Sequence, residues 1–269
     1  MATLLIALAV GGGAFAAAFF AADWGWGWSV TSGVVSFLAV QGTVGFLVQK
    51  RVKREMERVQ AILADGQKRL QQKMQRWQIR PPGSIQAAQR EIESDTKLFV
   101  RQALEQTKSL ERFRNWVPLM GRQIATARLQ LSWMIKDFKT VDELMPQSLF
   151  MDPQMSAIKM ARMYMKGAPM DEIAKVYRKG VARVRYNGNV MLAAAMSWMQ
   201  VQKGDADGAF KTLTEALKKS DNETLKRNHE VLMNNRVAHF TNSSLGDQWY
   251  SLLLEEPRVR QQRQRSVYR

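Results

Sequence analysis

The sequence predicts an all-α protein with an N-terminal transmembrane helical hairpin, a short coiled-coil-like stalk and a C-terminal α-helical repeat domain of the solenoid type. Three observations support this class. Two apolar runs fill the first 49 residues, a heptad-like spacing follows them, and helix-breaking stretches recur at regular intervals along the rest of the chain. No stretch after residue 83 alternates apolar and polar residues for long enough to predict a sheet.

Residues 1–49 are expected to form two membrane spans, at about 3–22 and 28–48. Each run has the roughly 20 apolar residues that a helix needs to cross a bilayer, and Asp23 is the single charged residue of the segment. Two alternatives stay open. A cleaved signal peptide would need a basic start, which "MAT" lacks, and it would still leave the second span. A soluble helix pair would normally carry a polar stripe, which neither run has.

The residues that flank the two runs indicate an orientation. Between the runs, "DWGWGW" supplies tryptophans for an aromatic belt at the membrane interface, namely Trp24, Trp26 and Trp28. After the second run, "QKRVKRE" supplies basic residues that mark the side retained in the cytoplasm, namely Lys50, Arg51, Lys53 and Arg54. We therefore expect an integral protein of the bacterial inner (cytoplasmic) membrane, in contact with the lipid bilayer and with both termini in the cytoplasm.

Residues 50–80 are predicted to form a basic amphipathic stalk. Apolar or nearly apolar positions recur with the four-and-three spacing of a coiled coil over roughly three to four heptads. These positions are Val52, Met56, Val59, Leu63, Gly66, Leu70, Lys73 and Trp77. The pattern permits self-association through the stalk, and it equally permits one amphipathic helix docked on the rest of the protein. "RPPG" at 80–83 ends the helix, because two successive prolines remove backbone donors.

Residues 84–151 are expected to form a segment of long helices. A first helix is predicted at about 84–114 and a second at about 119–139, and "NWVP" separates them. Proline and the residue before it disfavour helical geometry, so the chain should turn at this point.

Residues 152–257 are predicted to contain three helix pairs of about 35 residues each, a period typical of helical-repeat proteins. Asp152 before Pro153 predicts an N-cap followed by proline at the first helical position, and Asp221 or Asn222 predicts another cap. The regular spacing of breaks and caps therefore indicates a helical-repeat domain.

The second pair carries a family resemblance. Its segment "KGDADGAFKTLTEAL" resembles the turn and second helix of a tetratricopeptide repeat, with Ala209, Leu213 and Ala216 in that family's small, large, small order. Met196 and Ser197 take the family's places in the preceding helix, whereas the family's tryptophan, its later aromatic and its closing proline are missing. The first pair resembles the repeat more loosely, through Gly167, Ala174 and Tyr177. The third pair matches by length alone.

This resemblance implies a right-handed solenoid whose first helices line a concave groove for protein partners. Transferred to the second pair, it places four residues on the groove side, namely Met191, Ala194, Trp198 and Gln202. Trp198 would be the anchor of the groove, because exposed aromatic residues often dominate protein interfaces. The alternative is that Trp198 belongs to the core between repeats.

The net charge of +16 is concentrated in two short segments. Residues 50–80 hold ten basic and three acidic side chains, and the tail at 258–269 holds five arginines and no acid. The tail has no apolar periodicity and is expected to be disordered. These segments support a rival interpretation, a membrane-tethered binder of nucleic acid or anionic lipid that uses the stalk and the tail. Nucleic acid is the less favoured partner, because Tyr268 is the one aromatic residue among these arginines.

No residue pattern predicts catalysis, a metal site or a cofactor site. The chain has no cysteine, and its two histidines, His229 and His239, lack acidic partners at ligand spacing. We therefore expect no enzyme activity, no metal and no cofactor. The expected function is that of a membrane-anchored, cytoplasm-facing helical scaffold or adaptor, which binds partner proteins through the tetratricopeptide-like domain and raises their effective concentration at the membrane.

Overall fold

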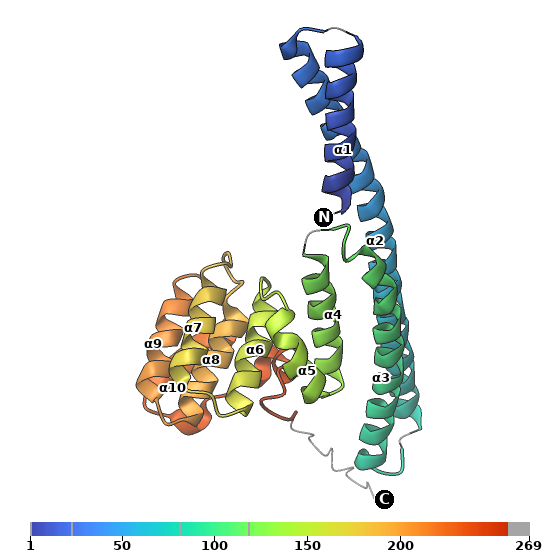
Figure 1. Ribbon diagram of the computed structural model, residues 1–269. Coiled ribbons are helices and arrows are strands. Elements are labelled where there is room, and N and C mark those ends of the chain that lie inside the picture. The colour runs from blue at the N-terminus through green and yellow to red at the C-terminus, as the bar shows by residue number, and fades with distance from the viewer. Residues whose placement is uncertain (1, 23, 81, 118, 258–269) are drawn as a thin grey trace, which may run out of the picture. The chain divides into compact units, whose positions relative to one another are not determined.

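The computed structural model describes residues 2–22, 24–80, 82–117 and 119–257 (Figure 1). These residues form helices and connecting turns and no β-strand, which confirms the all-α class. The predicted basic tail at 258–269 lies outside the described residues. Packing divides the chain into a first unit, Met1–Leu149, and a second unit, Phe150–Arg269.

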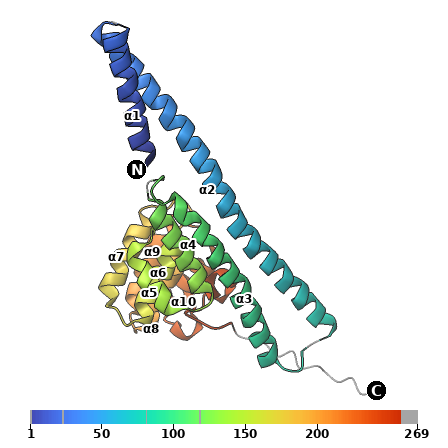
Figure 2. The ribbon, with the colours of Figure 1, turned by 45° about the vertical axis from the view of Figure 1, so that its right-hand side comes forward.

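The first unit begins with two antiparallel helices. Helix α1 (Ala2–Ala16) continues into a π-helical turn, η1 (Ala17–Ala21), and α2 then runs from Trp26 to Ile79 without interruption (Figure 2). The second apolar run and the predicted stalk are therefore one helix of 54 residues. This helix ends immediately before "RPPG", as the prolines predict.

Glycines let α1 and the first part of α2 approach closely. A Cβ atom placed on Gly11 would lie 2.9 Å from the carbonyl oxygen of Gly33, and one placed on Gly33 would lie 2.9 Å from the carbonyl oxygen of Gly11. Ala7 and Ser29 are also fully buried in this contact region. Small residues at a helix crossing allow the two backbones to make van der Waals contact, which is the main source of stability for helix pairs in lipid.

The first unit also contains α3 (Ile85–Thr107), η2 (Lys108–Phe113), α4 (Met120–Met134), α5 (Phe138–Leu144) and η3 (Met145–Gln147). Helix α3 and η2 pack against the stalk part of α2, α4 packs on α3 and η2, and α5 and η3 pack on α4. Ser84 caps α3 by accepting a hydrogen bond from the Ala87 amide at 3.1 Å. One core cluster joins α2 to α3 and α4 through Val59, Phe99, Val100, Ala103 and Leu131. The heptad-like positions of α2 thus pack within the chain, as in the second of the two alternatives for the stalk.

The second unit contains stacked helix pairs. The first pair is α6 (Pro153–Met165) with α7 (Met170–Val181), and the second is α8 (Val190–Gln202) with α9 (Ala206–Leu217). Helix α10 (Glu223–Met233) packs on α9 and α8. The predicted caps are confirmed: Asp152 accepts from the Gln154 amide, and Asn222 accepts from the amides of Thr224 and Leu225.

The prediction of a third complete helix pair is wrong. After α10 the chain forms two short 3-10 turns, η4 (Val237–His239) and η5 (Ser243–Leu245), and one four-residue helix, α11 (Asp247–Tyr250). Asn235 and Gly246 have positive φ angles of 54° and 61°, which break helical continuity on either side of these turns. The irregular segment from Thr241 to Leu252 therefore replaces the expected second helix.

Candidate functional site

The structure places the four predicted groove residues in different environments. Gln202 is exposed and Met191 is half-buried, but Ala194 is fully buried and Trp198 is 9% exposed. The Trp198 ring makes edge-to-face contacts with Tyr164 of α6 and Trp249 of α11, each at a centroid distance of 5.8 Å. Trp198 is therefore part of the core, as the alternative interpretation held.

The segment Thr241–Leu252 covers the face of α8 that was predicted to form the groove. Asn242 donates from Nδ2 to the carbonyl oxygen of Ala194 at 3.0 Å, and its Oδ1 accepts from Nδ2 of Asn228 at 2.8 Å. Asn228 Oδ1 in turn accepts from the Thr241 amide at 3.1 Å. Asn228, Asn242 and Trp249 are all fully buried. The expectation of an open groove at Ala194 and Trp198 is thus corrected, because the chain fills this face itself.

The residues that carried the family resemblance pack inside the second helix pair. Ala209, Leu213 and Ala216 of α9 are buried, and so are Met196 and Ser197 of α8. Asp205 caps α9 by accepting from the Gly208 amide at 2.8 Å. This packing stabilises a helical hairpin, and it is equally compatible with a hairpin of another family.

The predicted interface tryptophans are exposed at the turn between α1 and α2. Trp24 is 51% exposed, and Trp26 and Trp28 are each 71% exposed. Thr3–Ala21 and Trp26–Ile79 are both long and apolar enough to cross a membrane, and only 17% and 6% of their most apolar windows are buried. Both helices therefore present apolar side chains outward along most of their predicted spans.

The predicted basic cluster lies within α2, directly after the second apolar run. Lys50, Arg51, Lys53 and Arg54 are all exposed. Lys53 and Glu57 form an exposed ion pair at 3.9 Å, a geometry that contributes little to stability. These side chains are thus free to point into solvent or toward an anionic surface.

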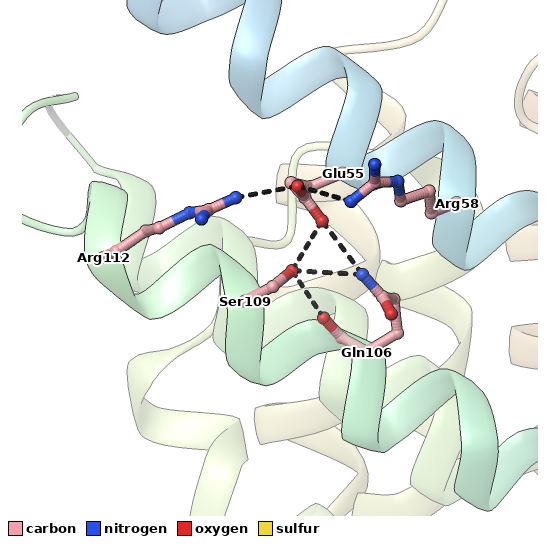
Figure 3. Close-up of polar contacts among 5 residues, drawn as sticks. All are labelled: Glu55, Arg58, Gln106, Ser109 and Arg112. Atoms are coloured by element: carbon pink, nitrogen blue, oxygen red, sulfur yellow. Dashed lines mark hydrogen bonds and ion pairs between the residues drawn. The ribbon is translucent and has the colours of Figure 1, made fainter.

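A buried carboxylate lies one residue beyond this cluster. Glu55 of α2 is 5% exposed, and four side chains from α2 and the α3–η2 junction form hydrogen bonds or ion pairs with it (Figure 3). Oε2 accepts from Ser109 and from Gln106 at 2.9 Å each. Oε1 accepts from Arg112 at 2.7 Å and from Arg58 at 2.9 Å. We call these five residues the Glu55 clamp, because they fix the register of α2 against the end of α3.

The Glu55 clamp makes the stability of this contact depend on pH. The hydrogen bond from Ser109, followed by the charges of Arg58 and Arg112, lowers the pKa of Glu55 below its ordinary value of 4.5, and burial opposes this shift. A carboxyl group with a lowered folded-state pKa adds stability above its unfolded pKa, and this stability is lost as the pH falls through the folded pKa.

Glu55→Gln is therefore expected to lower the free energy that holds α2 on η2 by about 1 to 3 kcal/mol at pH 7. Hydrogen exchange of the η2 amides in detergent micelles at pH 7 and at about pH 3 measures this effect, and the variant should lose most of the wild-type pH dependence between the two conditions. Glu57→Gln is the matched control, because Glu57 is exposed on the same helix. Equal behaviour of the two variants would contradict a role for the buried clamp.

Comparisons with protein-family models, curated proteins and solved structures found no match to this chain. Within the described ranges, no three or more histidine or acidic side chains come together as a possible metal site. The architecture and the chemistry of the side chains are therefore the basis for a functional proposal.

Two features of the structure were missed by sequence reasoning. One sequence signal could have revealed the Glu55 clamp. Glu55 is an acidic residue that directly follows four basic ones, and it lies between the apolar positions Val52 and Met56, which belong to the packed face. The hydrogen-bond network of Asn228 and Asn242 in the second unit had no such sequence signal, because both asparagines resemble ordinary cap and turn residues. Both features depend on contacts between residues far apart in the sequence.

Proposed function

We propose that this chain is a membrane-anchored helical scaffold with both termini in the cytoplasm, where its second unit binds partner proteins. The observation that carries the anchoring is the outward exposure of large apolar side chains on α1, η1 and the first part of α2. Among them are Leu5, Phe20, Leu38 and Phe46, which are 68%, 80%, 60% and 65% exposed. A soluble helix pair would bury such residues against a core, whereas lipid solvates them.

The partner surface needs a new location, because Trp198 is buried. Among residues 150–257, Tyr186 is the exposed aromatic side chain, at 65% exposure, in the turn between α7 and α8. Arg183 and Arg185 flank it and are also exposed. Tyrosine and arginine are enriched in the residues that dominate protein interfaces. We assign this turn, with Gln202 and Met191 as further accessible positions on α8, as the candidate partner surface.

Affinity purification of the full chain tests this proposal. The chain should stay in membranes washed with high salt, and after detergent extraction it should retain stoichiometric proteins that survive nuclease treatment. Tyr186→Ala should weaken their capture by about 2 kcal/mol, a typical loss for an aromatic anchor. Met233→Ala is the matched control, because Met233 is 61% exposed elsewhere in the same unit.

Other outcomes separate the rival interpretations. Release by salt would contradict anchoring by spans. Recovery of nucleic acid alone, with capture lost when the five arginines of the tail are replaced by glutamine, would favour the nucleic-acid binder. Capture that survives Tyr186→Ala unchanged would move the partner surface away from the turn.

A further inference from the structure

The connection between η2 and α4 returns to the level where the apolar part of α2 ends. From Val48, α2 runs 31 residues to Ile79, and α3 with η2 runs back over residues 85–113. At the rise of about 1.5 Å per helical residue, these two paths are of nearly equal length. The chain therefore comes back to the point at which the second apolar run gives way to the basic cluster.

Direct contacts confirm this position within the first unit. Val117 packs on the core cluster of Leu110, Phe113, Met120 and Ile124, and Val48 and Val52 of α2 pack on the same cluster. The hydroxyl of Thr3, at the start of α1, donates to the carbonyl oxygen of Trp116 at 3.3 Å. Figure 1 shows this connection beside the start of α1. The start of the first predicted span thus contacts this connection directly, and the end of the second span packs on the same cluster as the connection.

The connection between η2 and α4 exposes a leucine side chain in a backbone conformation that is unfavourable for leucine. Leu119 is 59% exposed and adopts φ 61° and ψ 5°, a left-handed conformation that is unfavourable for leucine. Trp116 and Val117 are half-buried beside it. An exposed leucine next to a tryptophan is a pairing that suits the boundary between headgroups and acyl chains.

Basic side chains surround this apolar tip. Arg114 and Arg122 are exposed on its two sides. With Arg128 they line a cleft of about 390 Å³, in which Glu111 is the one acidic residue and forms an ion pair with Arg128 at 2.7 Å. The guanidinium groups of Arg114 and Arg122 add to the positive charge of the cluster at residues 50–54 at the same level.

We propose that residues 114–117 and 119–122 form a lipid-contact loop, which rests on the anionic cytoplasmic face of the bilayer with Leu119 inserted and Arg114 and Arg122 on lipid phosphates. This inference rests on the proposed membrane anchoring. The bilayer is the occupant because the loop is continuous, through Thr3 and Val48, with the helices that would span it. Each basic side chain near an anionic surface adds about 1 kcal/mol to the attraction.

Single-cysteine labelling tests the loop, because the natural chain has no cysteine. Three variants of the full chain, Leu119→Cys, Leu38→Cys and Ile79→Cys, are labelled with a polarity-sensitive fluorophore and placed in vesicles of phosphatidylcholine and phosphatidylglycerol that contain spin-labelled quencher lipids. Leu38, which is 60% exposed near the middle of the predicted span, is the probe for the span, and Ile79, which is 88% exposed, is the probe for water at the far end of α2.

We expect quenching of the label at 38 by deep quenchers, quenching at 119 by shallow quenchers, and none at 79. Quenching at 38 with none at 119 would overturn the lipid-contact loop and leave the anchoring intact. No quenching at 38 would overturn the anchoring itself. Leu119→Gly, which relieves the positive φ, should fold at least as stably as the natural chain and so shows that folding does not require the leucine.

A charge variant tests the second part of the proposal. Arg114→Gln with Arg122→Gln should reduce quenching at 119 at least twofold in the anionic vesicles and have a much smaller effect in vesicles of phosphatidylcholine alone. Arg76→Gln with Arg69→Gln, at the far end of α2, is the matched control and should change nothing. Equal quenching at 119 with and without the arginines would overturn their assignment to lipid phosphate, and binding of a soluble protein to the loop in place of lipid would overturn the whole proposal.

Discussion

Trp249→Ala is expected to lower the free energy of unfolding of the second unit by about 3 to 5 kcal/mol, the usual cost of truncating a buried tryptophan. Trp249 is fully buried, contacts Trp198 edge-to-face, and donates from Nε1 to Glu255 at 2.7 Å. Its removal leaves a cavity beneath Thr241–Leu252 and an unpaired carboxylate. Urea unfolding of the full chain in detergent micelles, followed by near-ultraviolet circular dichroism, measures the loss.

A matched variant separates the core effect from a general effect of truncation. Met233→Ala removes an exposed side chain of the same unit and should change stability by no more than about 0.5 kcal/mol. Trp198→Ala should behave like Trp249→Ala, so a loss of partner capture in that variant would report damage to the fold. A Trp249→Ala protein as stable as the natural chain would mean that Thr241–Leu252 does not contribute to the core.

Gly66→Ala is expected to weaken the packing of α3 on α2 by about 1 to 3 kcal/mol, the cost of overpacking a core. Gly66 is buried, and a Cβ atom at this position would overlap the ring of Phe99, which is itself 8% exposed. The ring packs in one cluster with Val59 and Leu131, so making room for the methyl group requires a shift of the ring within this cluster. Hydrogen exchange of the α3 amides should accelerate accordingly.

The same substitution elsewhere in α2 provides the control. A Cβ atom at Gly42 would meet no atom within 4 Å, so Gly42→Ala should leave α3 protection unchanged. Combining Gly66→Ala with Phe99→Leu should recover part of the loss, because the smaller side chain makes room for the methyl group. If Gly66→Ala and Gly42→Ala behave alike, the close approach of Gly66 to Phe99 does not hold these helices together.

Local signals allowed much of the helical architecture to be predicted. The prolines at 81 and 82 stop α2, Asp152 and Asn222 cap their helices, and the two long apolar runs form helices with little buried surface. Each of these features depends on residues within a few positions of one another, so the sequence alone contains the cause. The alternating seam of α2 also predicted a packed face, although it left the partner of that face open.

The contents of the candidate groove could not be predicted in this way. Trp198 and Ala194 are buried by residues that follow them by about 50 positions, and the covering segment has no helical periodicity that would reveal its packing face. Its glycine and polar residues are typical of a turn, as is found at Gly246, and they carry no signal for the burial of Trp249. The burial of Glu55 likewise requires Ser109 and Arg112, which α3 brings back along α2.

The continuity of α2 has a mechanical consequence. A helix without a break from Trp26 to Ile79 transmits any change in its inclination over its whole length. The stalk part of α2 extends about 46 Å beyond Val48. If the apolar part of α2 tilts by about 20°, a typical value for a membrane helix, the end of α2 at Ile79 moves sideways by roughly 16 Å. Bilayer thickness, which is one influence on helix tilt, would thus affect how far from the membrane normal the turn between α2 and α3 is carried. A second point of contact with the lipid surface, at the proposed lipid-contact loop, would limit this sideways movement of α2.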